Sequence, residues 1–229
     1  MNKKWVTILF MFWSLLLISQ EKTSFISIKA GASFPVGKYG ASNLDYGCFT
    51  TTDTGVGFAV EGAWFFLPWL GAGGQFNVAF HPVDVALLGW ERVQNDPFLD
   101  DVTIRSDAYR AMTGALGLYG RWDFWRNFSL NGKILGGVMY AQSPYQLHKP
   151  TYFLVEPRWF EITSSRDYNA AIIAGAGLQY DVSHCVGLKL DADYTYSTVV
   201  FSFSTGSGVR YEYRDISFIN LSLGVVLNL

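Results

Sequence analysis

The chain has 229 residues, of which 50% are hydrophobic, 17% aromatic and only 16% charged. Soluble domains carry about 25% charged residues, yet the mean hydropathy of +0.17 is too low for a protein with many membrane-spanning helices. The formal net charge of -2 argues against a nucleic-acid binder, which needs a basic face, and two cysteines exclude a disulfide scaffold or a cysteine-rich zinc site. This composition is typical of a β-protein with one apolar and one polar face.

The N-terminus has the pattern of a targeting segment. Lys3 and Lys4 precede an apolar stretch over residues 5–18, and Ser19 is a small residue at the expected cleavage point. A membrane-spanning helix needs about 20 apolar residues, so this stretch is short for that role. We therefore predict a cleaved signal peptide over residues 1–19 and a single exported domain over residues 20–229, with an anchor or a buried helix as the alternative.

The rest of the chain alternates apolar and polar residues with a period of two, which indicates β-strands. Eight segments show the pattern, and each is long enough for a transmembrane β-strand, which needs about 9–11 residues. They lie at 26–34, 55–66, 72–81, 108–123, 128–140, 169–181, 186–196 and 219–229. The fold class that we predict is all-β, an eight-stranded antiparallel transmembrane β-barrel.

The connections between these segments alternate in length. Three are short, near residues 68–69, 125–127 and 183–184, and the others are long, at 36–54, 82–107, 143–166 and 197–214. Outer-membrane barrels have this arrangement, with short periplasmic turns and long extracellular loops. A soluble lipocalin-like ligand-binding barrel also has eight strands, but its apolar face points inward. Aromatic residues near the strand ends favour the membrane barrel.

The polar face carries charges of both signs. An eight-stranded barrel is just wide enough to be filled by side chains, so an open pore is not expected. We predict a structural interior polar network. The sharper alternative is an ion or proton path through Lys189, Asp191 and Asp193. The network consists of Lys29, Glu61, Lys133, Lys189, Asp191 and Asp193.

No pattern in the chain predicts a catalytic, cofactor-binding or metal site. The histidines at 81, 148 and 184 have no partner that the sequence identifies, and we expect no enzymatic activity and no cofactor. The acidic residues of 82–107 lack calcium-loop spacing and indicate a solvated loop. Cys48 and Cys185 fall at opposite ends of the barrel, so we expect no disulfide between them.

The last two long loops carry aromatic residues that form a candidate contact surface. We expect a small hairpin around residues 152–162, and a ribbon in which the last two strands continue beyond the bilayer, with a phase break near Thr198. Contact with lipopolysaccharide or packing between loops is the plainer interpretation. The surface consists of Tyr152, Phe153, Trp159, Phe160, Arg210, Tyr211 and Tyr213.

Three segments carry a resemblance to a known family. Residues 31–37 (GASFPVG), 174–180 (AGAGLQY) and 219–225 (INLSLGV) are similar to small outer-membrane barrels of the OmpX/OmpA-like type, particularly the PorT-like barrels of Bacteroidota. Such barrels commonly end in an aromatic residue, whereas residue 229 is Leu.

The predicted barrel implies a location in the cell outer membrane, with membrane lipid and lipopolysaccharide as partners. The resemblance adds contacts with other outer-membrane or secretion-system proteins, because PorT-like relatives serve protein export. The net charge of -2 argues against a nucleic-acid partner. We therefore expect a non-enzymatic membrane protein whose loops contact surface partners. The alternatives are a lipid A-modifying outer-membrane enzyme and a soluble lipocalin-like barrel.

Overall fold

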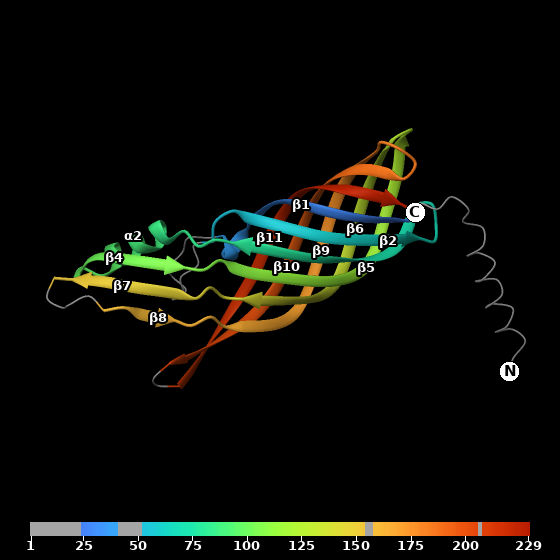
Figure 1. Cartoon of the computed structure of the whole chain (residues 1–229). Coiled ribbons are helices and arrows are strands. Elements are labelled where there is room, and N and C mark those ends of the chain that lie inside the picture. The colour runs from blue at the N-terminus through green and yellow to red at the C-terminus, as the bar shows by residue number, and fades with distance from the viewer. Residues whose placement is uncertain (1–23, 41–51, 154–157, 206–207) are drawn as a thin grey trace, which may run out of the picture.

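Eight antiparallel strands close into a barrel (Figure 1). The computed structural model describes residues 24–40, 52–153, 158–205 and 208–229, so the predicted signal peptide over 1–19 lies outside the described residues. The strands are β1 (Phe25–Pro35), β2 (Gly55–Phe65), β3 (Leu70–His81), β5 (Tyr109–Trp125), β6 (Phe128–Gln142), β9 (Arg166–Asp181), β10 (Val186–Thr205) and β11 (Gly208–Asn228). The first and last of these pair with each other, so the predicted fold class is confirmed.

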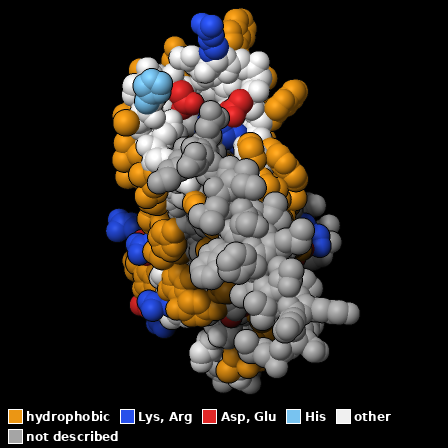
Figure 2. Space-filling view, turned by 90° about the vertical axis from the view of Figure 1, so that its right-hand side faces the viewer, with side chains coloured by type: hydrophobic (Ala, Val, Ile, Leu, Met, Phe, Trp, Pro, Cys, Tyr) orange, Lys and Arg blue, Asp and Glu red, His pale blue; other side chains and the backbone are white. Residues whose placement is uncertain are grey.

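The outer wall of the barrel is apolar. Side chains alternate across each strand, and the outward set includes Leu116, Ile134 and Leu223, which are 74%, 70% and 68% exposed. Hydrophobic side chains make up much of the barrel surface visible beside the grey residues in Figure 2. A lipocalin places such residues inside, so this exterior is that of a barrel in contact with lipid.

A second, smaller unit lies beyond the barrel, at the end opposite the C-terminus (Figure 1). It contains α2 (Val85–Asn95) and a three-stranded sheet in the order β4 (Leu99–Ser106), β7 (Gln146–Tyr152), β8 (Phe160–Ile162). The prediction of a simple acidic loop over 82–107 was therefore wrong. The Asp84 carboxylate accepts hydrogen bonds from the backbone N–H groups of Ala86 and Leu87, and so caps the start of α2. No helix among the described residues is long and apolar enough to span a membrane.

The predicted hairpin around 152–162 is present with different bounds. Residues 146–148 of β7 pair with 160–162 of β8, and β4 adds a third strand on the other edge of β7. The sequence pattern missed β4 because the adjacent Asp100 and Asp101 interrupt the alternation of apolar and polar residues.

Strands β10 and β11 extend well past the barrel as a two-stranded ribbon, as predicted (Figure 1). Their pairing runs without a register shift from Val186 opposite Leu227 to Thr205 opposite Gly208, so the break predicted near Thr198 is not a break in strand register. The backbone alternation continues, but apolar residues move to the inner face, where Val199 and Phe201 are fully buried. Near residue 198 the inward side chains therefore change from polar to apolar, while the strand pairing continues unchanged.

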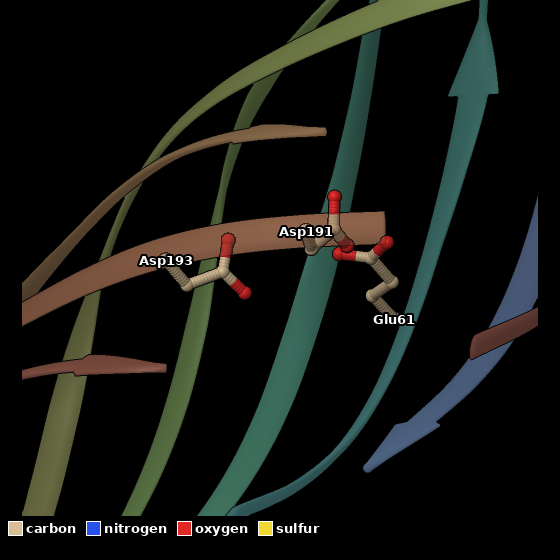
Figure 3. Close-up of side chains that lie close together, drawn as sticks. All are labelled: Glu61, Asp191 and Asp193. Atoms are coloured by element: carbon tan, nitrogen blue, oxygen red, sulfur yellow. The ribbon is translucent and has the colours of Figure 1, made fainter. Parts of the chain in front are cut away.

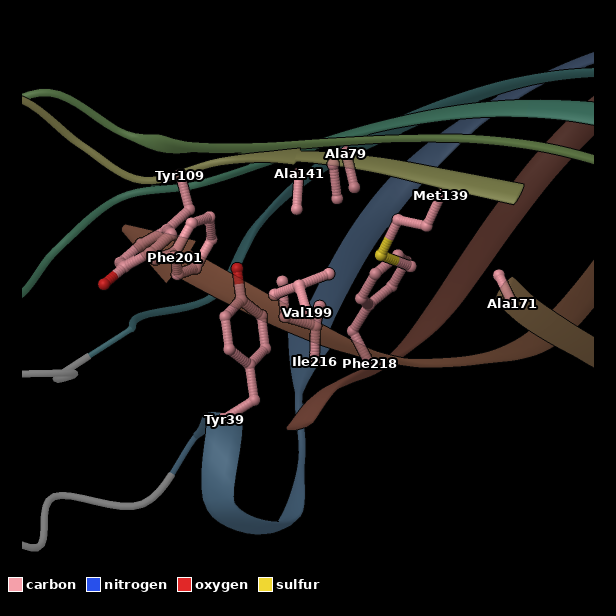
Figure 4. Close-up of a cluster of buried hydrophobic side chains, with 11 residues drawn as sticks. Tyr39, Ala79, Tyr109, Met139, Ala141, Ala171, Val199, Phe201, Ile216 and Phe218 are labelled. Atoms are coloured by element: carbon pink, nitrogen blue, oxygen red, sulfur yellow. The ribbon is translucent and has the colours of Figure 1, made fainter. Parts of the chain in front are cut away.

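An apolar cluster fills the barrel at the end that carries the long loops (Figure 4). It includes Tyr39, from the short 3-10 helix η1 (Gly37–Tyr39), together with Tyr109, Met139, Phe201 and Phe218, all at most 3% exposed. A second cluster, with Phe25, Phe65, Tyr119, Leu135 and Ile173 among its members, lies lower in the barrel. The interior is therefore packed with side chains at both levels.

Candidate functional site

The six residues of the predicted interior polar network lie together inside the barrel. Strands β1, β2, β6 and β10 supply them, with Lys189, Asp191 and Asp193 successive inward positions of β10. All six are at most 6% exposed. The structure thus brings together residues that are up to 164 positions apart in the chain.

Each lysine of the network contacts at least two carboxylates. The Nζ of Lys29 lies 2.7 Å from Asp191 Oδ2, 2.7 Å from Asp193 Oδ2 and 3.0 Å from Glu61 Oε2. Lys133 Nζ lies 2.6 Å from Glu61 Oε2 and 2.8 Å from Asp193 Oδ1. Lys189 pairs with Glu61 and lies 3.3 Å from Asp191 Oδ2. Three ammonium groups and three carboxylates therefore cancel in charge.

Two neutral side chains add hydrogen bonds to the network, and the sequence pattern did not identify either. Ser27 donates a hydrogen bond to Glu61 Oε1 at 3.1 Å, and Gln75 donates one to Asp193 Oδ2 at 3.0 Å. The only signal available for them was their position on the polar face of β1 and β3. Buried charges are tolerated where hydrogen bonds satisfy their remaining lone pairs.

Two glycines of β9 make room for the carboxylates. Gly177 lies opposite Asp191 and Gly175 lies opposite Asp193 in the β9–β10 pairing. A Cβ atom at either glycine would overlap the Oδ1 atom of the facing aspartate. Gly175 and Gly177 of the AGAGLQY segment are thus required by the site.

The three carboxylates have the spacing of a metal site, since oxygen atoms of Glu61, Asp191 and Asp193 lie within 4.8 Å of one another (Figure 3). Calcium and magnesium prefer such oxygen ligands. The lysine ammonium groups already contact these oxygens, however, and a cation added there would face three positive charges. The arrangement therefore favours a closed ion-pair network over a metal centre.

A second buried polar group lies nearer the long-loop end. His81 Nε2 is 2.8 Å from Ser33 Oγ, and His81 Nδ1 is 3.2 Å from the Tyr39 hydroxyl. A neutral imidazole donates from one nitrogen and accepts at the other, so one hydroxyl donates to His81 and the other accepts from it. Burial raises the pKa of the Tyr39 hydroxyl well above its usual range. This Ser–His contact was not predicted, because its two members lie on β1 and β3, which are separated by β2 in the sheet.

Access to this group is closed. Ser33 and His81 are both 0% exposed, and the rings of Tyr39 and Phe218 pack against the imidazole at 5.3 and 5.1 Å between centroids. A nucleophile must meet its substrate. In this conformation the Ser33–His81 contact acts as a packed polar link between β1 and β3.

The other histidines and the cysteines lie apart from both groups. His148 is buried in the small sheet, where it hydrogen-bonds to Gln146 at 3.1 Å and stacks on Phe160. His184 and Cys185 are exposed in the short turn between β9 and β10. Cys48 lies outside the described residues, so the expectation that it is not bonded to Cys185 remains a prediction.

The candidate contact residues fall on two separate elements. Tyr152, Phe153, Trp159 and Phe160 belong to the small sheet and its turn, and Arg210, Tyr211 and Tyr213 belong to the ribbon. All seven are exposed, most of all Tyr213 at 79% and Phe153 at 72%. Arg105 and Lys149 lie over the Trp159 ring at 5.7 Å from its centroid, which adds charge to an aromatic surface.

No protein-family model matches the chain, and no curated protein is similar enough to count as a match. Among solved structures, the barrel is similar to a major outer-membrane protein of Thermus thermophilus, with 14% identity over 90% of this chain and 99% of that one, and a TM-score of 0.48. It is similar to the neisserial surface protein NspA, with 10% identity over 90% and 97% of the two chains and a TM-score of 0.47. It is also similar to Ail of Yersinia pestis, with 17% identity over 90% and 97% and a TM-score of 0.44. At such low similarity, the architecture rests on the strand pairing itself.

Proposed function

We propose that this protein is an integral outer-membrane β-barrel without enzymatic activity, whose long-loop end contacts partners at the cell surface. The observation that carries the proposal is the division of surfaces along one axis. A closed barrel has an apolar wall, and the candidate contact residues are exposed on two elements beyond one end of it. Aromatic residues together with Arg are enriched in protein interfaces.

The charge network supports a structural role for the barrel interior. It is neutral in charge, and packed side chains lie on either side of it. A barrel of eight strands with such a filling supports its loops rigidly and conducts nothing. We infer that function resides in the small sheet and the ribbon.

The resemblance to PorT-like barrels favours one class of partner. On that basis, we propose that the exposed aromatic surfaces contact other outer-membrane or secretion-associated proteins. Lipopolysaccharide is the second partner that we propose. With the long loops facing outward, as their length predicts, the parts of the small sheet and the ribbon nearest the barrel lie next to the outer leaflet.

One contact favours the alternative of a lipid A-modifying enzyme, namely the Ser33–His81 pair at 2.8 Å. Such an activity requires the Tyr39 side chain to leave the barrel mouth. Mass spectrometry of lipid A from a gene-deletion strain separates the two functions. An altered lipid A pattern that wild-type protein restores and a Ser33→Ala variant does not would replace our proposal with the enzyme.

The proposal is tested by membrane localisation and by capture of partners. We expect the protein in the outer-membrane fraction, with unheated samples migrating differently from boiled ones on gels. Purification from native membranes should recover a partner whose amount falls in a Tyr211→Ser/Tyr213→Ser variant of the ribbon. A matched Trp90→Ser variant, on the exposed face of α2, serves as control. Migration unaffected by heating, or recovery from the soluble fraction, would contradict the proposal.

A further inference from the structure

The outer wall has a groove just below its long-loop edge. The groove has a volume of about 380 Å³ and crosses four neighbouring strands, β3, β5, β6 and β9. It is lined by Phe76, Met112, Gly114, Val138, Tyr140 and Tyr168. Gly114 keeps the groove open, because it has no side chain to occupy this space. The nearest atom to a Cβ placed there would be in the Phe76 ring, at 4.0 Å.

Two arginines lie directly above this groove. In the strand register Arg110 of β5 is opposite Gln142 of β6, and Gln142 is opposite Arg166 of β9. Both arginines are exposed, and neither forms a salt bridge within the described residues. Because neighbouring strands are about 4.8 Å apart, the two arginine backbones are separated by roughly 10 Å.

The next row of outward residues, one step toward the short-turn end, belongs to the groove itself. Met112 is opposite Tyr140, which is opposite Tyr168, and the two tyrosine rings pack at 4.9 Å between centroids. The Tyr140 hydroxyl points toward the arginine row, where it donates to Gln142 Oε1 at 3.5 Å. Tyrosine is enriched at membrane–water interfaces, with its ring toward the lipid and its hydroxyl toward the headgroups.

The height of the outer wall places the two arginines at the membrane–water interface. Along β5 the outward positions run from Arg110 to Trp122, a span of twelve residues. At about 3.3 Å per residue and a strand tilt of about 45°, this span covers roughly 28 Å of membrane. That is close to the apolar band of about 25 Å in outer-membrane barrels. The arginine row therefore lies at the headgroups of the outer leaflet, and the groove lies among the acyl chains.

We propose that this groove and its two arginines bind a phosphorylated acyl glycolipid of the outer leaflet. An acyl chain lies in the groove, and Arg110 and Arg166 bind phosphate oxygens, for which the guanidinium fork is well suited. The inference rests on the proposed location in the outer membrane. The charge at the rim of the groove indicates an anionic occupant, because Arg110 and Arg166 have no carboxylate partner among the described residues. Lys38, on the other side of the barrel, differs in this respect, since it pairs with Asp215 at 3.6 Å.

The test is native mass spectrometry of the folded barrel released from mixed lipid nanodiscs. Diphosphorylated lipid A, the same lipid after phosphatase treatment, and phosphatidylglycerol are supplied in equal amounts. We expect diphosphorylated lipid A to be retained at least tenfold more than either of the others. An Arg110→Ser/Arg166→Ser variant should lose that preference, and a Gly114→Leu variant, which fills the groove, should lose it too.

The matched control is Arg126→Ser, which removes an exposed arginine from the short turn between β5 and β6. It should leave lipid retention unchanged. Equal retention of the three lipids, or of lipid A by the wild type and the double arginine variant, would overturn the proposal, as would dimers in place of bound lipid. Heat-dependent gel migration is measured for every variant, because it shows that the barrel has folded. A folded barrel without lipid preference would contradict only the lipid site, whereas failure of the wild-type barrel to insert would contradict the proposed function.

Discussion

Lys29 contacts all three carboxylates of the charge network, since its ammonium group lies within 3.0 Å of oxygen atoms on Glu61, Asp191 and Asp193. A buried ion pair contributes little net stability compared with apolar residues of the same shape, but removal of one partner leaves an uncompensated charge. The barrel is therefore far more sensitive to loss of one network residue than to loss of an exposed charge.

A Lys29→Met substitution leaves three carboxylates facing two lysines. We expect it to lower the free energy of unfolding by about 3–5 kcal/mol, measured by urea titration of the barrel in detergent micelles. The control is Lys38→Met, which removes an exposed lysine paired with Asp215 at 3.6 Å and should cost less than about 1 kcal/mol. Equal effects of the two substitutions would show that the network does not stabilise the barrel.

Sequence reasoning reached these charges because they stand at every second position of apolar strands. It could not find Ser33, His81 and Tyr39 as a group, because η1 turns Tyr39 into the barrel mouth and no periodicity describes such a turn. Gln75 was equally hidden, since an uncharged polar residue on the inner face looks like any other lumen residue until its partner, Asp193, is located.

At the scale of elements, the barrel strands were predictable and the loop structures were not. Alternation fixes a strand wherever one face meets lipid, as in β6 and β9. In β4, by contrast, two adjacent aspartates interrupt the alternation. For α2, a cap such as Asp84 becomes informative only when the helix is known. The three-stranded sheet is held by local contacts, among them the buried His148 stacked on Phe160 at 5.0 Å.

The stability of this small sheet should depend on pH. Burial, together with the nearby Arg92 guanidinium, lowers the pKa of His148 from 6.5 to about 4. The opened sheet therefore takes up a proton more readily than the closed sheet, and the closed form loses stability as the pH falls from about 6.5 to about 4.

Amide hydrogen exchange at Ile104, which lies opposite His148 in β4, measures this effect. After correction for the intrinsic pH dependence, we expect protection of this amide to fall over that range. A His148→Leu variant should have a flat profile, whereas a variant at the exposed His184 should behave as the wild type. Unchanged protection of the wild type between pH 6.5 and 4 would show that protonation of His148 does not destabilise the small sheet.

At the scale of the whole molecule, the barrel interior consists of layers. An apolar cluster closes the long-loop end, and the charge network lies beneath it beside the second apolar cluster. Lys189 also lies over the ring of Phe25, at 4.8 Å from its centroid. Ions crossing the barrel would have to displace both the rings and the paired charges.

We therefore expect no unit conductance when the folded protein is added to planar lipid bilayers. A 16-stranded porin, which leaves an aqueous channel, is the positive control in the same apparatus. Substitution of Tyr39 by Ala should also leave the bilayer non-conducting, because the charge network below it remains. Discrete current steps from the wild-type protein would show that the interior opens, and would revive the interpretation of the network as an ion path.

The pairing of β1 with β11 also bears on the order of events during biogenesis. Without β11, the edges of β1 and β10 would lack hydrogen-bond partners, and each unpaired backbone group costs several kcal/mol within hydrocarbon. Lys29 likewise finds Asp191 only after 162 further residues have been made. Insertion one hairpin at a time would leave these edges unpaired in hydrocarbon until β11 closes the ring, so the pairing of β1 with β11 is the step that removes this cost.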